Sequence, residues 1–240
     1  MSQSNFNARV LHSSRGRWSR KSSLSPSYRI RILPGFCVYP NCSISFTMQM
    51  LQPHHFKRFL IDSLSRTSPR ALAVPSLQRA GVLVPLVNAG EHYNFLFTKR
   101  TEIVDTHKGQ VSFPGGVADP MDTDIRDTAL REVWEELGIA RSAVEAIGLL
   151  DDLQTPTGFI ITPVVGVIEN MPALSINIHE VAEVFQVPLG FFVDPANGRS
   201  ELRILDGKQR EVWSYDTGTH VIWGATAMII RSLLSTLGMI

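Results

Sequence analysis

Short apolar runs alternate with helical stretches along most of the chain, and this pattern predicts a mixed α/β fold. Phe56, Phe59, Leu60 and Leu64 recur at helical spacing, which predicts a short amphipathic helix over 53–65. A second apolar stripe predicts a core-packed C-terminal helix over 225–237. Runs of β-branched and aromatic residues predict strands over 82–87, 93–98, 109–113, 144–150, 160–168, 184–187, 201–205 and 210–215.

A third helix carries three carboxylates within five residues, namely Glu132, Glu135 and Glu136. On a helix, Glu132 and Glu136 lie one turn apart on the same face with Glu135 beside them, whereas Val133 and Leu137 point toward a core. Like charges at this spacing repel, so such a face is most simply a site for a divalent cation. The alternative is a solvated helix face with intrahelical ion pairs, which is common.

The segment around this helix has clear boundary signals. Asp124 or Asp127 can cap its start, and Gly138 ends it. A turn at Gly115-Gly116 precedes it, and glycine allows the backbone to approach a ligand without a side chain in the way. A backbone carbonyl near Gly116 could therefore supply a further oxygen ligand for a cation.

Gly115-Gly116, followed after a loop by R-E-V-W-E-E-L-G-I over 131–139, resembles the signature of the Nudix hydrolases. That signature reads G-x5-E-x7-R-E-U-x-E-E-x-G-U, where U is aliphatic. Every fixed residue of its second half is present here.

The first half departs from the family pattern. Counting back from Arg131, the expected Glu falls on Thr123 and the expected Gly on Val117, and Asp119 and Asp122 are the nearby acids. The loop is therefore one residue longer than in the signature. A longer loop of this kind is familiar from one Nudix branch, the coenzyme A pyrophosphatases.

A second marker of that branch stands upstream, of the form L-L-T-x-R-S, three residues, R, three residues, G-Q-V-x-F-P-G-G. The chain reads L-F-T-K-R-T over 96–101 and G-Q-V-S-F-P-G-G over 109–116, but Asp105 takes the place of the second Arg. The resemblance runs from about residue 80 to the C-terminus. It implies an α/β/α sandwich with a mixed β-sheet, and a Nudix hydrolase domain over 51–240.

The resemblance also implies roles for individual residues. Mg²⁺ or Mn²⁺ prefers oxygen ligands, here those of Glu132, Glu135, Glu136 and the Gly116 carbonyl. Glu135 is expected to take the proton of the attacking water, with Glu180 as the second candidate. Arg131 is expected to pair with Glu135 and orient the acids, or to form a plain ion pair.

The implied substrate is a small nucleotide. Arg100 is the best candidate for a phosphate contact, beside the backbone at Gly115 and Gly116. The implied reaction is hydrolysis of the diphosphate in coenzyme A or its acyl esters, although the anionic Asp105 weakens this expectation. The alternatives are another nucleoside diphosphate derivative (ADP-ribose, NADH or a damaged nucleotide) and a non-catalytic ligand sensor, against which the intact trio of acids argues.

Residues 1–50 differ in composition from the rest. They contain seven Arg or Lys, eleven Ser and no acid, since the first acid of the chain is Asp62. This is typical of a transit peptide. The alternatives are a disordered tail, or a misassigned start with Met48 or Met50 as the initiator.

The overall balance excludes some functions. A net charge of +1 gives no basis for attraction to nucleic acid or to a membrane surface, and no apolar run approaches the length that spans a bilayer. Cys37 and Cys42 stand five apart with no second pair and no nearby His, which makes a poor zinc site, and a reducing compartment is the default. We expect a cytoplasmic enzyme, or a mitochondrial one if the N-terminal segment is a transit peptide, and leave assembly into a homodimer open.

Overall fold

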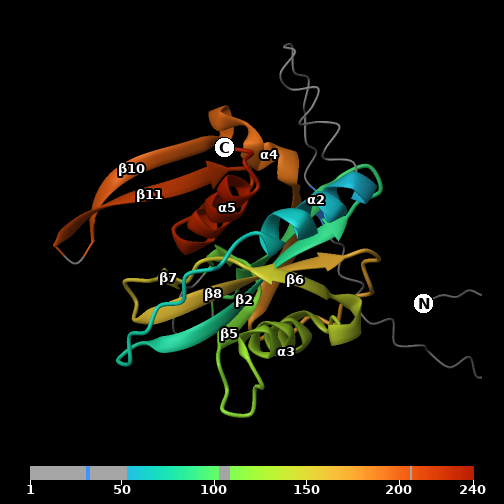
Figure 1. The fold of residues 1–240 in the computed structure, drawn as a ribbon, viewed down its shortest axis with the longest axis horizontal. Coiled ribbons are helices and arrows are strands. Elements are labelled where there is room, and N and C mark those ends of the chain that lie inside the picture. The colour runs from blue at the N-terminus through green and yellow to red at the C-terminus, as the bar shows by residue number, and fades with distance from the viewer. Residues whose placement is uncertain (1–30, 33–52, 103–108, 206) are drawn as a thin grey trace, which may run out of the picture.

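The main element of the fold is a mixed sheet that is covered by helices on both faces (Figure 1). The computed structural model describes residues 31–32, 53–102, 109–205 and 207–240. Within these residues the sheet has nine strands, six of them in one continuous hydrogen-bonded path. In spatial order the path is β1 (Arg31–Ile32), β9 (Val181–Pro188), β3 (Tyr93–Arg100), β2 (Gln78–Asn88), β8 (Phe159–Ile168) and β6 (Glu145–Leu149).

Three short strands pair with this path: β4 (Val111–Ser112) with β3, β5 (Gly115–Val117) with β2, and β7 (Leu153–Gln154) with β8. The central pair β2–β8 is parallel, as is β1–β9, whereas the other pairs are antiparallel. The sheet is therefore mixed, as the sequence predicts.

Each face of the sheet has its own apolar core. Helices α2 (Pro53–Ser65) and α5 (Ala225–Thr236) cover one face, which is rich in buried aromatic side chains. Helix α3 (Ile125–Leu137) covers the other face and packs mainly on aliphatic side chains of β2, β8 and β9 (Figure 1). The α/β/α sandwich is confirmed, and no helix among the described residues is long and apolar enough to cross a membrane.

A second sheet projects beside α5 (Figure 1). It contains β10 (Gly198–Leu205), β11 (Lys208–Asp216) and β12 (Val221–Trp223), all antiparallel. Three short helices, η1 (Arg141–Ala143), α4 (Leu189–Val193) and η2 (Pro195–Asn197), complete the described elements. The sequence predicts β10 and β11 but not β12 or α4, because these short elements form by packing rather than by a local pattern.

Helix α3 begins and ends where the sequence predicts. Asp124 is the N-cap, and its carboxylate accepts a hydrogen bond of 2.9 Å from the backbone N–H of Asp127. Gly138 ends the helix in the left-handed conformation, with φ 70°. Between these caps, Val133 and Leu137 are buried against the sheet.

The expected turn at Gly115-Gly116 is wrong, because both glycines lie in strand β5 and pair with β2. A Cβ on Gly115 would lie 2.5 Å from the carbonyl oxygen of Gly81, and a Cβ on Gly81 would lie 2.7 Å from that of Ile125. The glycines therefore allow β5, β2 and the start of α3 to pack closely. This pairing is tertiary, so the local pattern does not reveal it.

The N-terminal segment contributes β1, which pairs in parallel with Phe185 and Gln186 of β9. The rest of 1–52 lies outside the described residues, and with it lie Cys37, Cys42 and the alternative start sites. The division at residue 50 and the cellular location therefore stay predictions.

Candidate active site

Helix α3 places its three acids in three different environments. Glu135 is half exposed, Glu132 retains a side-chain exposure of 15%, and Glu136 is only 4% exposed. The expectation of one shared acidic face is therefore incomplete. Glu136 follows Val133 by three residues, so the helix turns it toward the sheet.

Arg131 forms hydrogen bonds with two of these acids and with Asp122. Its guanidinium donates to both oxygens of Asp122, at 2.9 and 3.0 Å, and to the carbonyl of Val117 at 3.0 Å. It also donates to Glu132 at 2.8 Å and to Glu135 at 3.0 Å, so the expected pair with Glu135 is present. Hydrogen bonding between Arg131 and Asp122 raises the pKa of the guanidinium and lowers that of the carboxyl well below its usual range.

Asp122 joins this cluster through Arg131, although the sequence pattern assigns it no role. It stands next to Thr123, the position where the Nudix signature has Glu. Its carboxylate also accepts from the backbone N–H of Asp119 at 2.9 Å and from the hydroxyl of Thr128 at 2.8 Å. The one-residue extension of the loop therefore shifts the anchoring acid by one position.

The backbone of β5 lies directly against the acids of α3. A Cβ added at Gly116 would stand 2.5 Å from the carboxyl carbon of Glu132. The backbone N–H of Gly115 donates to the Glu136 carboxyl and lowers its pKa. A side chain at position 116 would displace the Glu132 carboxylate, so this position requires glycine.

Burial dominates the electrostatics of Glu136. It raises the pKa to about 8, against the lowering effect of Arg100, and the charges of Glu132 and Glu180 raise it further. Burial likewise raises the pKa of Glu132, although Arg131 opposes the shift. One oxygen of Glu136, Oε2, is buried without a hydrogen-bond partner among the described residues.

Glu180 reaches this cluster through a loop that caps the end of α3. The backbone N–H groups of Ser175 and Asn177 donate to the carbonyls of Leu137 and Glu136, both at 2.9 Å. The Asn177 side chain then donates to Glu180 at 3.1 Å and orients it. Sequence reasoning missed Asn177, for which the Asn-x-x-Glu spacing is a weak local signal.

Arg100 ends β3 beside the same cluster. Its backbone N–H donates to the carbonyl of Gln110 at 3.0 Å, and the pairing of β3 with β9 shifts register between Lys99 and Arg100. Its Nε is buried without a hydrogen-bond partner in the described part of the chain. Asp105, which takes the place of the second Arg of the marker, lies outside the described residues.

A family model described as the NUDIX domain matches residues 77–203, which is more than half of the chain. The chain belongs to the Nudix hydrolase family. A Photorhabdus laumondii protein named uncharacterized Nudix hydrolase NudL is 40% identical over 160 residues, covering 65% of this chain and 83% of that protein. The Enterobacter sp. (strain 638) protein of the same name is 40% identical over 166 residues, covering 68% and 84%. A crystal structure of a C. elegans Ap4A hydrolase binary complex aligns with 19% identity and TM-score 0.40, over 48% and 82%.

The residues of this Nudix domain fit a hard divalent cation. The oxygens of four carboxylates and a glycine backbone match the donors that Mg²⁺ and Mn²⁺ prefer, and Oε2 of Glu136 has no hydrogen-bond partner among the described residues that would compete with a cation. Among the described residues, no three acidic, histidine or cysteine side chains are already arranged as a metal cage. Arg131 accounts for part of this, because it binds Glu132 and Glu135.

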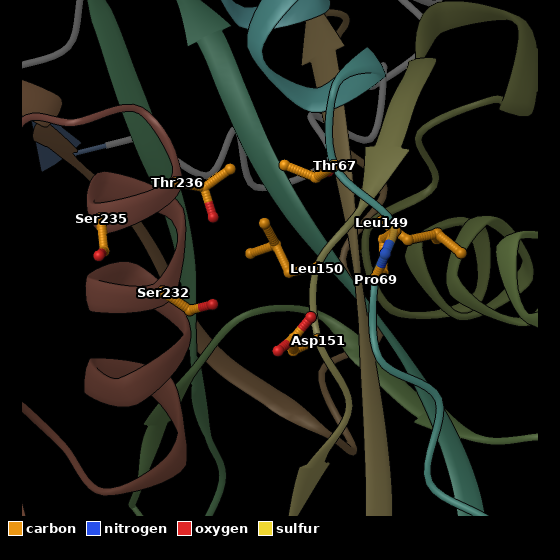
Figure 2. A pocket seen from close by; sticks show the side chains of 8 residues that line it. All are labelled: Thr67, Pro69, Leu149, Leu150, Asp151, Ser232, Ser235 and Thr236. Atoms are coloured by element: carbon orange, nitrogen blue, oxygen red, sulfur yellow. The ribbon is translucent and has the colours of Figure 1, made fainter.

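A cavity of about 310 Å³ lies elsewhere in the Nudix domain, between α5 and the segment that follows α2 (Figure 2). Its lining includes the hydroxyl side chains of Thr67, Ser232 and Thr236, one carboxylate, Asp151, and no cationic side chain. Asp151 already accepts a hydrogen bond from the backbone of Arg70 at 2.8 Å. This cavity has no positive charge that would bind a diphosphate. The acids of α3 can hold a cation and have Arg100 beside them, so we take them as the candidate active site.

Proposed function

We propose that this Nudix hydrolase cleaves the diphosphate of coenzyme A or acyl-CoA, with Mg²⁺ or Mn²⁺ as cofactor. The products are 4′-phosphopantetheine and adenosine 3′,5′-bisphosphate. The observation that carries the proposal is that the two upstream marker segments lie together beside the α3 acids. Thr98 and Lys99 pair with Ser112 and Val111, and β5 lies against α3.

Glu132, Glu135, Glu136 and the carbonyl of Gly116 would hold the cation. When bound, such an ion neutralises diphosphate oxygens and lowers the pKa of the attacking water. Arg131 keeps two of these carboxylates in place, and Asp122 fixes Arg131 through a two-pronged contact.

The reaction is an in-line attack of water on phosphorus. The new bond forms between the water oxygen and one phosphorus, the bridging P–O bond breaks, and the bridging oxygen leaves on the other phosphate. Glu135 accepts the water proton, since it is the most exposed acid of the trio, with Glu180 as the second candidate. Arg100 contacts the diphosphate, aided by the backbone at Gly115 and Gly116.

A product panel tests the substrate. Coenzyme A, an acyl-CoA, ADP-ribose, NADH and an oxidised nucleotide are incubated with the protein and Mn²⁺, and the products are separated by chromatography. Release of adenosine 3′,5′-bisphosphate from coenzyme A supports the proposal. Brisk turnover of ADP-ribose without turnover of coenzyme A would reject this substrate and keep the family.

The second candidate function is hydrolysis of another nucleoside diphosphate derivative, which Asp105 favours. An anion at that position opposes a polyanionic ligand if it contacts phosphate. Asp105→Arg should then improve the apparent affinity for coenzyme A. A third candidate, a non-catalytic sensor, requires that every substrate of the panel is bound but not cleaved.

A further inference from the structure

Arg100 and Glu136 each have a buried polar atom without a hydrogen-bond partner among the described residues, Nε of the arginine and Oε2 of the acid. The two residues come from different elements, the end of β3 and the last turn of α3. The positive charge of Arg100 stabilises the ionised form of Glu136. Because the buried Nε of Arg100 and the buried Oε2 of Glu136 lack hydrogen-bond partners among the described residues, both groups depend on the charges around them.

The backbone fixes Arg100 between the two segments that carry the site. Its N–H donates to Gln110, in the segment that leads to β5. The next residue, Thr101, donates from its N–H to the carbonyl of Glu180 at 3.0 Å and from its hydroxyl to that of His179 at 3.0 Å. The guanidinium of Arg100 is therefore attached to a rigid part of the site.

The other arginine of the site is already committed. Arg131 donates to Asp122, Glu132, Glu135 and the carbonyl of Val117. Within the described residues, Arg100 forms no ion pair of 4.0 Å or less with any acid. Arg100 is therefore the positive charge at this site that can change partner.

We propose that Arg100 is a counter-cation that is shared between the acid cluster and the substrate, so that binding of a divalent cation and binding of a diphosphate are coupled through it. This inference rests on the proposed function. Without the ion, the guanidinium offsets the negative charge of the acid cluster, in which Glu132 and Glu180 act on Glu136 electrostatically. A divalent cation at the same carboxylates takes over that role and repels the guanidinium, which then pairs with diphosphate oxygens.

Titration of the full-length protein with Mn²⁺ alone tests the first half, with free Mn²⁺ counted by electron paramagnetic resonance. Arg100→Gln and Arg100→Met should bind Mn²⁺ about tenfold more tightly than the wild type, because one repelling charge is removed. Arg100→Lys keeps the charge and should stay within about twofold of the wild type. Arg58→Gln is the matched control, since it removes one charge from an exposed arginine of α2, on the other face of the sheet from α3, and should leave the affinity unchanged.

Calorimetry with α,β-methylene-ADP in the presence of Mn²⁺ tests the second half. Arg100→Gln should bind this diphosphate about tenfold more weakly, although it binds Mn²⁺ more tightly. A loss of folding would weaken the binding of Mn²⁺ and of the diphosphate alike, so it cannot explain tighter Mn²⁺ binding together with weaker diphosphate binding in one variant.

Unchanged or weaker Mn²⁺ affinity in both neutral variants would overturn the inference, as would a large change in Arg100→Lys. These measurements use no substrate turnover, so they separate the inference from the choice of substrate. If the wild type bound no Mn²⁺, the proposed function and the inference would both be overturned.

Discussion

Helices α3 and α5 lie on opposite faces of one sheet and have nearly the same length, 13 and 12 residues, but they differ in the kind of side chain that they bury. Helix α5 buries Ile230, Leu233 and Leu234, and its buried polar residue Thr226 donates to the carbonyl of Val111 at 3.3 Å. Helix α3 buries a similar apolar stripe and, beside it, Glu136 with one oxygen unpartnered.

The contrast is between α5, which buries mostly apolar side chains, and α3, which also buries an ionisable side chain at the candidate active site. An apolar stripe stabilises in proportion to the area that it buries. A buried acid disfavours its own charge and, as an ionised group, costs free energy unless it is compensated. The acid of α3 therefore makes physical sense if a cation compensates it. Variants of the two helices should accordingly fail in different ways.

The largest expected effect is on the activity of α3 variants. Glu135→Gln keeps the size of the side chain but removes its charge and its ability to accept a proton. We expect kcat to fall by about 10²–10⁴-fold, the range for loss of a general base, with little change in the melting temperature. Steady-state kinetics on the best substrate of the panel, together with thermal unfolding, measures both quantities.

Glu211→Gln on β11 is the matched control, because it makes the same chemical change at an exposed acid outside the site. It should leave kcat unchanged. Near-normal turnover by Glu135→Gln would remove Glu135 from the mechanism and favour Glu180.

The next effect is on the stability of α5 variants. Ile230→Ala removes a fully buried side chain from the aromatic-rich core and should lower the free energy of unfolding by about 2–5 kcal/mol. The kcat of the folded fraction should not change. Urea denaturation measures the loss, and Ser235→Ala, at an exposed position of the same helix, should stay within about 0.5 kcal/mol of the wild type. A loss of kcat without a loss of stability would contradict the division between the helices.

The two helices also show how far the sequence predicts the fold. The span of α3 follows from Asp124 and Gly138, and the apolar spacing of α5 marks its buried side, because both signals are local. Strands β5, β7 and β12 are only two or three residues long and depend on a partner strand. No periodicity can emerge over so few residues, so these strands were missed.

The sequence predicts which residues make up the candidate site but not how they are arranged. Helical spacing places Glu132, Glu135 and Glu136 near one another, but it does not show how closely the sheet covers Glu136. The contact between Arg131 and Asp122 depends on the path of an irregular loop. The sequence gives only an indirect sign of it, because the signature expects an acid at position 123 and Asp122 stands beside that position. Contacts between distant segments are set by the tertiary fold, and the sequence pattern carries no signal for them.

A pH-dependent stability follows from the buried acid of α3. The folded-state pKa of Glu136, about 8, exceeds the unfolded value near 4.5, so the folded state binds the proton more tightly. The stabilisation that this gives is complete below about pH 4.5 and is lost as the pH rises through 8. Urea denaturation with a chelator should show a loss on the order of 3 kcal/mol between pH 5 and pH 9 from this group.

Glu136→Gln cannot titrate and should remove most of that slope, while the raised pKa of Glu132 leaves a smaller slope of the same sign. The lowered pKa of Asp122 acts in a different range, because its stabilisation is lost only at strongly acidic pH. Added Mn²⁺ should flatten the slope of the wild type by stabilising the ionised form. An equal slope in Glu136→Gln and in the wild type would show that Glu136 is not the group responsible.

The smallest effect concerns how the two helices begin. Asp124 caps α3 with its side chain, whereas α5 starts at Gly224 without a side-chain cap. Asp124→Ala should lower the free energy of unfolding by about 1 kcal/mol, because the N–H of Asp127 loses its acceptor. Asp124→Asn keeps an acceptor oxygen and should retain most of the stability, which separates the cap from the exposed contact between Asp124 and Arg126 at 3.9 Å. Equal losses of unfolding free energy in both variants would assign the effect to the charge of Asp124 rather than to capping. The start of α3 would then be set mainly by the packing of the helix on β2.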